Sequence, residues 1–329
     1  MKKVYWLFSA FLMLSVLVST PAMAQKQLEP LTISAGSGGM VGSVCVAIRN
    51  GYFAEEGLDI QIKSYRNGFV AAQEYLKGAT DFGTSNRVGA ILSNIDFEKH
   101  ALVGVLAYSD SQTKIVAKKS AGILDSSDLR GKRIGIVHGT SSHYYLYKYL
   151  QHCGIPMSDV EVVFLKKKQL PTAIVSGKID AFCQHGKPVA DALKKLGSDA
   201  LVLRNSNINR KIVQLIAPRD FIAKNPEKMQ GMLRAIKKAD AWTVDHKKEA
   251  AKIIAEMKNR SYDLVLNFVE NEAEFNLSLE QSLLLSFEGV DRWAIENELV
   301  PYKEPRNFLD YIDYHPLEQV SPESVSIIR

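Results

Sequence analysis

Short apolar segments alternate with amphipathic helical segments over residues 31–216. The side chains of Leu58, Ile60 and Ile62 alternate with polar ones, which is the pattern of a half-buried strand. Residues 144–152 instead carry apolar side chains three and four positions apart, as in an amphipathic helix. Strands that alternate with helices in this way predict an α/β fold. We expect the strands at residues 31–34, 58–62, 80–85, 102–108, 114–117, 133–137, 160–165, 179–183, 200–203 and 212–216.

Beyond Pro218 the strand pattern stops and helical patterns follow. Asn225-Pro226-Glu227 has the form of a helix start, with proline at the first helical position and a carboxylate in the first turn. Helices without a sheet of their own must pack on an existing one. We therefore expect two α/β lobes, joined by two crossing strands that form a hinge over a cleft. Lobe I takes residues 25–112 and 214–329, and lobe II takes residues 113–213. Further helices are expected at residues 247–258, 279–287 and 291–298.

The first 24 residues have the layout of a secretory signal peptide. Lys2 and Lys3 precede an apolar run over residues 4–18, and Ala22-Met23-Ala24 ends the segment as a cleavage site. The run is shorter than the roughly 20 residues of a membrane span, although an uncleaved anchor remains an alternative. No cysteine stands at the cleavage site, which disfavours a lipid anchor. We expect an exported protein that works outside the cytoplasm without stable membrane insertion.

Net charge and cysteine content narrow the class of protein. Loss of Lys2 and Lys3 lowers the formal net charge from +5 to +3. This small surplus argues against a nucleic-acid partner, which would need basic residues gathered on one face. The lysines at 166–168 are interpreted as a solvated strand end.

The chain has three cysteines, Cys45, Cys153 and Cys183. Because the number is odd, at least one thiol is unpaired. We expect the cysteines to be small buried hydrophobic residues rather than nucleophiles.

A short loop of small and hydroxyl side chains joins the strand at 133–137 to the helix at 144–152. This loop reads Gly139-Thr140-Ser141-Ser142. The first backbone N–H groups of a helix have no partner within the helix and can hold an anion or a polar group. A second loop, Gly36-Ser37-Gly38-Gly39, follows the first strand. A dinucleotide-binding fingerprint is disfavoured there, because Val41 stands where a third small residue would be needed.

Candidate ligand contacts share one property, which is that each lies near the end of a predicted strand. Arg66 could pair with an anion through two parallel hydrogen bonds or be an ordinary exposed arginine. Tyr108 could line the cleft or pack at the hinge, and His185 could donate to a ligand or cap a helix. His143 is expected to be structural. The candidates are Ser37, Gly38, Gly39, Met40, Arg66, Asn67, Thr84, Ser85, Asn86, Tyr108, Ser109, Gly139, Thr140, Ser141, Ser142, Gln184 and His185.

The sequence offers no constellation typical of catalysis. It has no metal-ligand spacing, no Gly-x-Ser-x-Gly turn and no carboxylates paired at helical spacing. We therefore expect a binding protein rather than an enzyme, with no catalytic residue, no metal and no cofactor.

Several motifs match a known family in order and spacing. The segment 51–59, Gly-Tyr-Phe-Ala-Glu-Glu-Gly-Leu-Asp, is similar to a family signature. The segments 78–83, Gly-Ala-Thr-Asp-Phe-Gly, and 177–182, Gly-Lys-Ile-Asp-Ala-Phe, are similar to two others. The chain resembles the periplasmic solute-binding proteins of ABC importers in the nitrate/sulfonate/taurine and NMT1/THI5-like group. The resemblance covers nearly the whole chain after residue 24.

The resemblance implies a type II periplasmic-binding fold that closes on one small solute and delivers it to an ABC permease, acting as a monomer. The loop at 139–143 is closest to the sulfonate- and taurine-binding members, which implies a small polar anion. Those members often carry a tryptophan and a proline soon after the Asp-Ala strand, which corresponds here to residues 179–183. This chain continues Cys183-Gln184-His185-Gly186 instead, so the ligand's identity is not carried over.

Two other classes of protein remain as alternatives. An enzyme of the thiamine-pyrimidine synthase branch, or a binder of the pyrimidine precursor, would have the same fold. The enzyme would be expected in the cytoplasm with a cysteine-rich iron-binding segment, and this sequence has neither feature. The other alternative is the input module of a sensor kinase or the receptor of a tripartite transporter.

Overall fold

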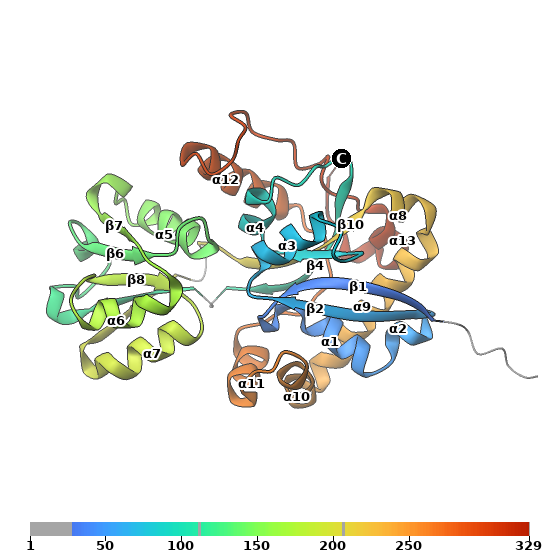
Figure 1. Cartoon of the computed structure of the whole chain (residues 1–329), viewed down its shortest axis with the longest axis horizontal. Helices are drawn as coiled ribbons and strands as arrows, with labels where there is room; N and C mark the ends of the chain where they lie inside the picture. The colour runs from blue at the N-terminus through green and yellow to red at the C-terminus, as the bar shows by residue number, and fades with distance from the viewer. Residues whose placement is uncertain (1–27, 111–112, 206–207, 329) are drawn as a thin grey trace, which may run out of the picture.

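A computed structural model describes residues 28–110, 113–205 and 208–328. It has two α/β lobes that lie side by side (Figure 1). Lobe I contains strands β1 to β4 and β10, and lobe II contains strands β5 to β9. The predicted two-lobed α/β architecture is confirmed. The signal peptide expected over residues 1–24 lies outside the described residues.

In the described part of lobe I, the two-stranded sheet β2-β1 and the three-stranded sheet β3-β10-β4 are joined by a bridge between Ile33 and Phe82, which gives the order β2-β1-β3-β10-β4. β1 (Glu29–Gly36) pairs in parallel with β2 (Leu58–Tyr65). β10 (Lys211–Pro218) runs antiparallel between β3 (Gly83–Ser85) and β4 (His100–Ser109). The amide of Ser34 donates to the carbonyl of Phe82 at 2.9 Å and joins the two parts of the sheet. As a result, β1 to β4 all end at the edge where β10 begins.

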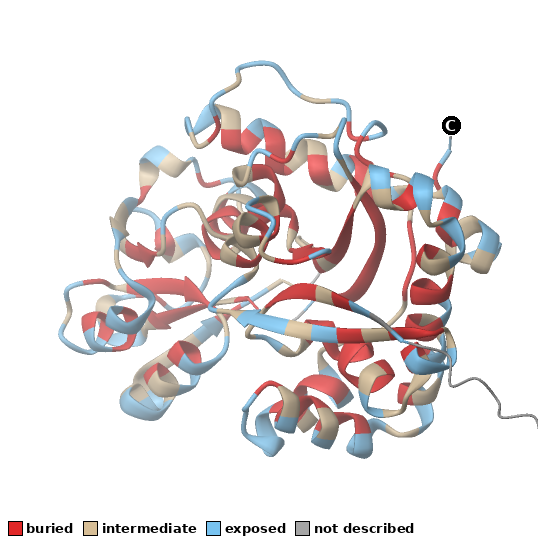
Figure 2. Cartoon of the chain, turned by 45° about the vertical axis from the view of Figure 1, so that its right-hand side comes forward, coloured by how far each residue is buried: buried red, intermediate tan, exposed pale blue. Residues whose placement is uncertain are grey.

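Helices cover both faces of this sheet and complete the core of lobe I (Figure 1). α9 (Pro226–Asp245) begins at the predicted Asn225-Pro226 step and packs on α1 (Gly42–Arg49). Figure 2 shows the buried positions along the strands and the inner faces of the helices. The other helices of lobe I are α2 (Tyr52–Glu55), α3 (Gly68–Leu76), α4 (Arg87–Leu92), α8 (Arg219–Lys224), α10 (Lys247–Met257), α11 (Tyr262–Asn271), α12 (Ser282–Glu296) and α13 (His315–Val320).

α12 is one helix where the sequence predicted two, so that prediction was wrong. Asp291 was interpreted as the start of a second helix. Its side chain is instead fully buried and accepts hydrogen bonds from the Tyr302 hydroxyl at 2.6 Å and from the Arg306 amide at 3.1 Å. Asp291 thus anchors the segment that follows α12, and the helix runs through without a break.

The sheet of lobe II, as described, has the order β7-β6-β8-β5-β9. Its apolar side chains form separate clusters on the two faces of the sheet. α5 (Ser141–His152) covers one face, and α6 (Leu170–Val175) and α7 (Lys187–Leu196) cover the other (Figure 1). The strands are β5 (Lys114–Lys118), β6 (Arg133–Ile136), β7 (Glu161–Phe164), β8 (Ala181–Gln184) and β9 (Ala200–Leu203).

The chain passes between the lobes twice, from β4 to β5 and from β9 to β10 (Figure 1). Side chains also connect the lobes, because Tyr144 of α5 belongs to the apolar core cluster of lobe I. In addition, the Tyr147 hydroxyl donates to Glu296 Oε2 at 3.3 Å. The two sheets therefore present their strand ends toward the same crossing region. Within the described residues, no helix combines the length and apolarity that a membrane span requires.

Candidate functional site

Loops at the ends of β1, β2 and β3 meet in lobe I. The Ser37 hydroxyl donates to the Arg66 carbonyl at 3.1 Å, and the Ser85 hydroxyl donates to the Gly68 carbonyl at 3.0 Å. A Cβ placed on Gly68 would lie 3.3 Å from the amide nitrogen of Asn86. The structure therefore brings together the candidates that the sequence placed on three separate loops.

Two of these candidates act as helix caps. The side chain of Asn67 accepts from the Val70 amide at 2.9 Å and begins α3. Asn86 accepts from the Gly89 amide at 2.9 Å and begins α4. Each carboxamide oxygen satisfies one orphan N–H of its helix, while its NH2 group stays available as a donor.

The loop after β1 divides into exposed and covered positions. Gly38 is exposed, and a Cβ there would meet nothing within 4 Å. A Cβ on Gly39 would lie 3.0 Å from the Phe268 ring of α11, and Met40 is buried in the core. Thr84 is also buried, where its hydroxyl donates to the Ser34 carbonyl at 2.8 Å. Gly38 is thus the position of this group with open space in front of it.

In lobe II, the loop after β6 turns into α5 at Gly139, whose φ of 62° favours glycine. Thr140 caps α5 by accepting from the His143 amide, and its hydroxyl donates to the Val137 carbonyl at 2.7 Å. The half-buried Ser141 is the first residue of the helix. This is the predicted helix start with its first amides at the strand edge.

The end of β8 is tied to the same helix start. The buried Ser142 hydroxyl donates to Gln184 Oε1 at 3.0 Å, and that oxygen also accepts from the His185 amide at 3.0 Å. The half-buried His185 has its Nδ1 atom out of contact with solvent and without a hydrogen-bond partner among the described residues. A buried nitrogen without a partner costs free energy, so this atom is a point where a ligand would be favoured.

The end of β4 lies at the first crossing between the lobes. Tyr108 is 1% exposed, its hydroxyl is 2.7 Å from the Ser278 hydroxyl, and the Arg210 guanidinium lies 4.0 Å above its ring. Tyr108 is therefore buried at this crossing and held by contacts with Ser278 and Arg210. The neighbouring Ser109 has a buried hydroxyl oxygen without a hydrogen-bond partner within the described part of the chain.

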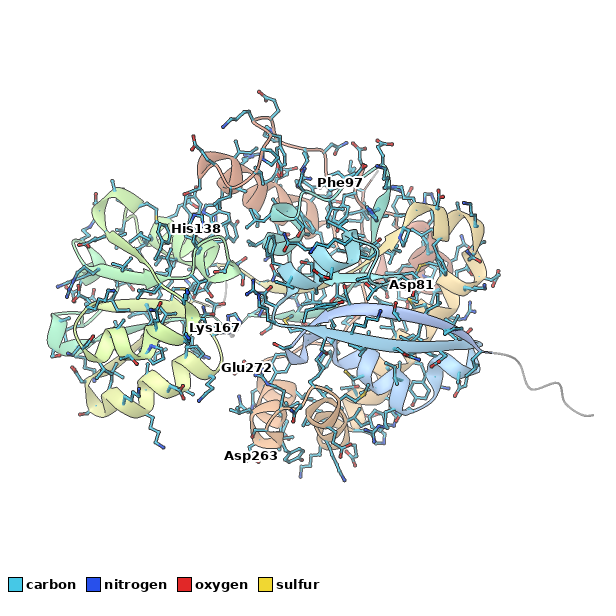
Figure 3. All side chains as sticks on the ribbon, viewed as in Figure 1. Asp81, Phe97, His138, Lys167, Asp263 and Glu272 are labelled. Atoms are coloured by element: carbon cyan, nitrogen blue, oxygen red, sulfur yellow. The ribbon has the colours of Figure 1, made fainter. Side chains whose placement is uncertain are left out.

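Four basic side chains from both lobes act electrostatically on His185, and we call this set the basic cluster: Lys114, Lys167, His185, Lys211 and Arg260. The pKa of His185 is held well below its usual value, first by the charge of Lys211, then by burial, and then by the charges of Lys167, Lys114 and Arg260. Burial, together with the charge of Lys167, lowers the pKa of Lys211 to about 8 although Glu272 opposes the shift. In Figure 3, Lys167 of lobe II and Glu272 of lobe I lie between the lobes. The site is therefore electropositive.

Arg87 is a further residue at the crossing, and the sequence analysis missed it. It is 7% exposed, and its guanidinium donates to Asn209 Oδ1 at 2.7 Å and to the Arg210 carbonyl. Burial lowers the pKa of Arg87 to about 10. Its place directly after the predicted Thr84-Ser85-Asn86 strand end was a usable signal. From the sequence alone, however, an arginine at the first position of a short helix is expected at the surface. In the folded chain, the second crossing covers it.

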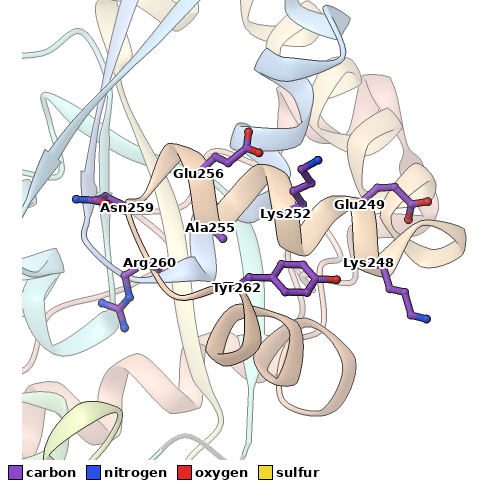
Figure 4. A pocket seen from close by; sticks show the side chains of 8 residues that line it. All are labelled: Lys248, Glu249, Lys252, Ala255, Glu256, Asn259, Arg260 and Tyr262. Atoms are coloured by element: carbon purple, nitrogen blue, oxygen red, sulfur yellow. The ribbon is translucent and has the colours of Figure 1, made fainter.

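A surface hollow lies along two helices of lobe I, and Arg260 of the basic cluster is one of its lining residues. It is a groove of about 690 Å³ along α10 and the start of α11, with Lys252, Glu256 and Tyr262 among its lining residues (Figure 4). A smaller hollow of about 310 Å³ lies beside Tyr147 and Pro156. No group of three or more histidine, cysteine, aspartate or glutamate side chains that could hold a metal ion occurs among the described residues.

The family model described as NMT1/THI5 like matches residues 41–250, which hold most of the strand-end loops. The chain belongs to the NMT1/THI5-like family. The predicted family resemblance is thereby confirmed.

Other NMT1/THI5-like relatives carry different names. A binding protein of Brucella abortus (strain 2308) is 25% identical over 280 residues, which cover 82% of this chain and 84% of that protein. The 4-amino-5-hydroxymethyl-2-methylpyrimidine phosphate synthase THI13 of Saccharomyces cerevisiae is 29% identical over 211 residues, covering 60% of this chain and 61% of that enzyme.

The fold of this NMT1/THI5-like chain is that of a periplasmic binding protein. The crystal structure of the periplasmic aliphatic sulphonate binding protein SsuA from Escherichia coli superposes with a TM-score of 0.73. The match covers 86% of this chain and 97% of SsuA at 19% sequence identity. At that identity the likeness establishes the common two-lobed fold, as predicted.

Proposed function

We propose that this protein is a periplasmic receptor of an ABC importer, and that it binds a small polar anion such as a sulfonate between its lobes. The single observation that carries the proposal is the basic cluster. Its members come from loops of both lobes and from the strands of the two crossings. A ligand bound among them would therefore contact both lobes and the segments that join them. The names of the SsuA and Brucella relatives support the same class of function.

The local chemistry favours an anion over a neutral solute. The α5 start provides amide groups, and Gly38 leaves room for close approach in lobe I. His185 Nδ1 and the Ser109 hydroxyl are buried polar atoms without partners among the described residues. A ligand that pairs with both lobes stabilises the closed arrangement, because the open one lacks half of the contacts.

The cellular setting belongs to the same proposal. Residues 1–24 act as the signal peptide, and the remaining chain works in the periplasm as a monomer. The hinge divides lobe I, with residues 25–112 and 214–329, from lobe II, with residues 113–213. The closed form then docks on an ABC permease.

A calorimetric titration tests the ligand class. The secreted protein is titrated with alkanesulfonates, taurine, nitrate and uncharged pyrimidines. We expect binding of at least one small anion, and we expect Lys211→Gln to weaken it by about tenfold because a half-buried charge is lost from the site. Lys168→Gln is the matched control, since Lys168 is exposed and outside the basic cluster. A folded protein that binds none of the anions contradicts the proposal.

A second candidate function is an enzyme related to the yeast synthase, which the 29% identity favours. Two of the three described thiols, Cys45 and Cys183, give it no support as nucleophiles. Burial raises the pKa of Cys45 to about 11 and raises the pKa of Cys183 as well, so neither forms a reactive thiolate near neutral pH. Detection of a pyrimidine phosphate product made by the purified protein would favour the enzyme.

A further inference from the structure

The groove along α10 is bordered by this helix and by the turn that leads into α11. In Figure 4 the Tyr262 ring lies alongside α10, with Arg260 toward one end of the groove and Lys248 and Glu249 toward the other. Tyr262 is 40% exposed although its side chain is large and mostly apolar. α10 has 11 residues and is therefore about 16 Å long, the length of about five residues of extended chain. The groove thus has room for a short peptide segment beside an aromatic ring.

The charges that line this groove are mainly positive. One of its two carboxylates, Glu256, pairs outside the lining residues with Arg49 at 2.9 Å, which leaves Glu249 as the other. Three exposed lining cations make no salt bridge and no side-chain hydrogen bond within the described part of the chain: Lys248, Lys252 and Arg260. The groove therefore favours a negatively charged partner.

The spacing of the two lysines indicates the form of that partner. Lys248 and Lys252 are four residues apart in α10, so they lie on one face of the helix and about 6 Å apart along its axis. Like charges at this spacing repel each other, and a partner with two anionic groups would relieve the repulsion. In an extended chain, side chains two residues apart point to the same side and lie about 7 Å apart. Acidic side chains at alternate positions therefore match the two lysines.

We propose that the groove along α10 binds an extended acidic segment of another protein. Two alternate carboxylates of the segment pair with Lys248 and Lys252, and an intervening apolar side chain packs on the Tyr262 ring. A single small anion would occupy only part of the length of α10, and a flat membrane surface does not fit a concave groove of about 690 Å³. This interaction goes beyond the proposed receptor function, because the groove lies on lobe I and needs no ligand between the lobes.

Two pentapeptides that differ only in charge test the proposal. The first has glutamate at its first, third and fifth positions and phenylalanine between them, and the second has glutamine in place of each glutamate. Each carries an uncharged fluorescent label and is titrated with the secreted protein, with fluorescence anisotropy as the measurement. We expect the glutamate peptide to bind about tenfold or more tightly than the glutamine peptide at about 50 mM salt, and to lose most of this advantage at about 200 mM.

Variants of exposed residues then locate the binding surface. Lys248→Glu and Lys252→Glu should each weaken binding of the glutamate peptide by about fivefold or more, because each reverses a charge in the groove. Lys247→Glu is the matched control, since Lys247 is exposed on the same helix and does not line the groove. Tyr262→Ala should weaken binding of both peptides by about threefold or more through loss of the ring. Arg260 is left unchanged because it also belongs to the basic cluster, and thermal melting checks that each variant folds.

Three results would overturn the acidic segment. These are no binding of the glutamate peptide by the folded protein, equal binding of the two peptides, and an effect of Lys247→Glu as large as that of Lys252→Glu. Phosphatidylglycerol vesicles are a further probe. If the vesicles bind through Lys252 and the peptide does not bind, the groove contacts a membrane surface and the proposal is wrong. None of these measurements involves a ligand between the lobes, so the proposed receptor function is tested separately.

Discussion

The imidazole of His143 in lobe II meets the indole of Trp293 in lobe I edge-on, with ring centroids 5.0 Å apart and ring planes inclined by 86°. Tyr144 contacts the same indole at a centroid distance of 5.3 Å. Trp293 is 1% exposed, so two consecutive residues of α5 help to cover a side chain of the other lobe. The relative position of the lobes is thus set in part by aromatic packing beside the crossings.

This contact predicts that Trp293 reports lobe movement by fluorescence. Trp242 is the other tryptophan outside residues 1–24, and it stacks on His246 at 4.4 Å, away from lobe II. We expect an anion that changes the lobe angle to alter the emission of the Trp242→Phe variant but not that of Trp293→Phe. Titration of both variants with ethanesulfonate or sulfoacetate measures this. A signal that disappears with Trp242 instead would contradict the prediction.

Acid should weaken the fold through His143. Burial, followed by the charge of His138, lowers the pKa of His143 to about 4, from an ordinary value of 6.5. The unfolded chain therefore binds the proton more readily, and stability is lost as the pH falls from about 6.5 to about 4. The loss amounts to up to about 3 kcal/mol. Urea unfolding at pH 7.5 and 4.5 measures how much stability is lost in acid. We expect this loss to be smaller in His143→Phe than in the parent, because phenylalanine keeps a ring against Trp293 but cannot bind a proton. An unchanged loss would refute this role.

Asp240 should have the opposite dependence over the same range. The side chain is 5% exposed, and it accepts from the Ser43 hydroxyl and from the Leu277 amide at 2.7 Å. Burial raises the pKa of Asp240 to about 6 from 3.8, so the folded state holds the proton more tightly. Its contribution is fully present below about pH 4 and is lost as the pH rises through about 6.

Asp240→Asn tests this sign directly. The carboxamide can accept from the Leu277 amide and donate to Ser43 without carrying a charge. At each pH, the free energy of unfolding of the variant is compared with that of the parent. We expect this difference to favour the variant by about 1–3 kcal/mol more at pH 7.5 than at pH 4.5. Urea unfolding at the two pH values measures the difference. The same difference at both values would show that the carboxyl does not titrate as stated.

Arg87 at the start of α4 should stabilise the second crossing through its hydrogen bonds to Asn209 and Arg210. Arg87→Lys keeps the charge but loses the planar group that donates to both Asn209 and the Arg210 carbonyl. We expect a loss of about 1–3 kcal/mol in the free energy of unfolding, since a buried charged hydrogen bond is removed. Arg49→Lys is the control, because Arg49 pairs with Glu256 at an exposed site and should change stability by less than about 0.5 kcal/mol. Equal effects of the two substitutions would exclude the role given to Arg87.

Periodicity was a good guide to the strands and a weaker one to the helix ends. Alternation at Leu58, Ile60 and Ile62 predicted β2, which extends to Tyr65. The apolar pattern did not distinguish one long helix from two at α12, because Asp291 has the residue type of a helix start. Only its buried contacts with Tyr302 and Arg306 reveal its role.

The three cysteines illustrate what residue type alone can predict. All three are free thiols. Cys45 and Cys183 are fully buried, as expected for small hydrophobes, whereas Cys153 is only half-buried. The candidate loops at Ser37, Asn67 and Asn86 were also predictable as strand ends. Their role in ligand contact stays a prediction.

By itself, the sequence determined the alternation of strands and helices, the two-lobed family fold and the strand-end loops, because these follow from local periodicity and turn chemistry. The tertiary structure alone decided which charges meet. The four cations of the basic cluster are far apart along the chain: Lys114, Lys167, Lys211 and Arg260. From the sequence, each would be expected to be a solvated surface residue. They gather, and Arg87 becomes buried, only because the two crossings bring one edge of each sheet to the same place. Electrostatic interaction depends on distance in space, which local sequence does not specify.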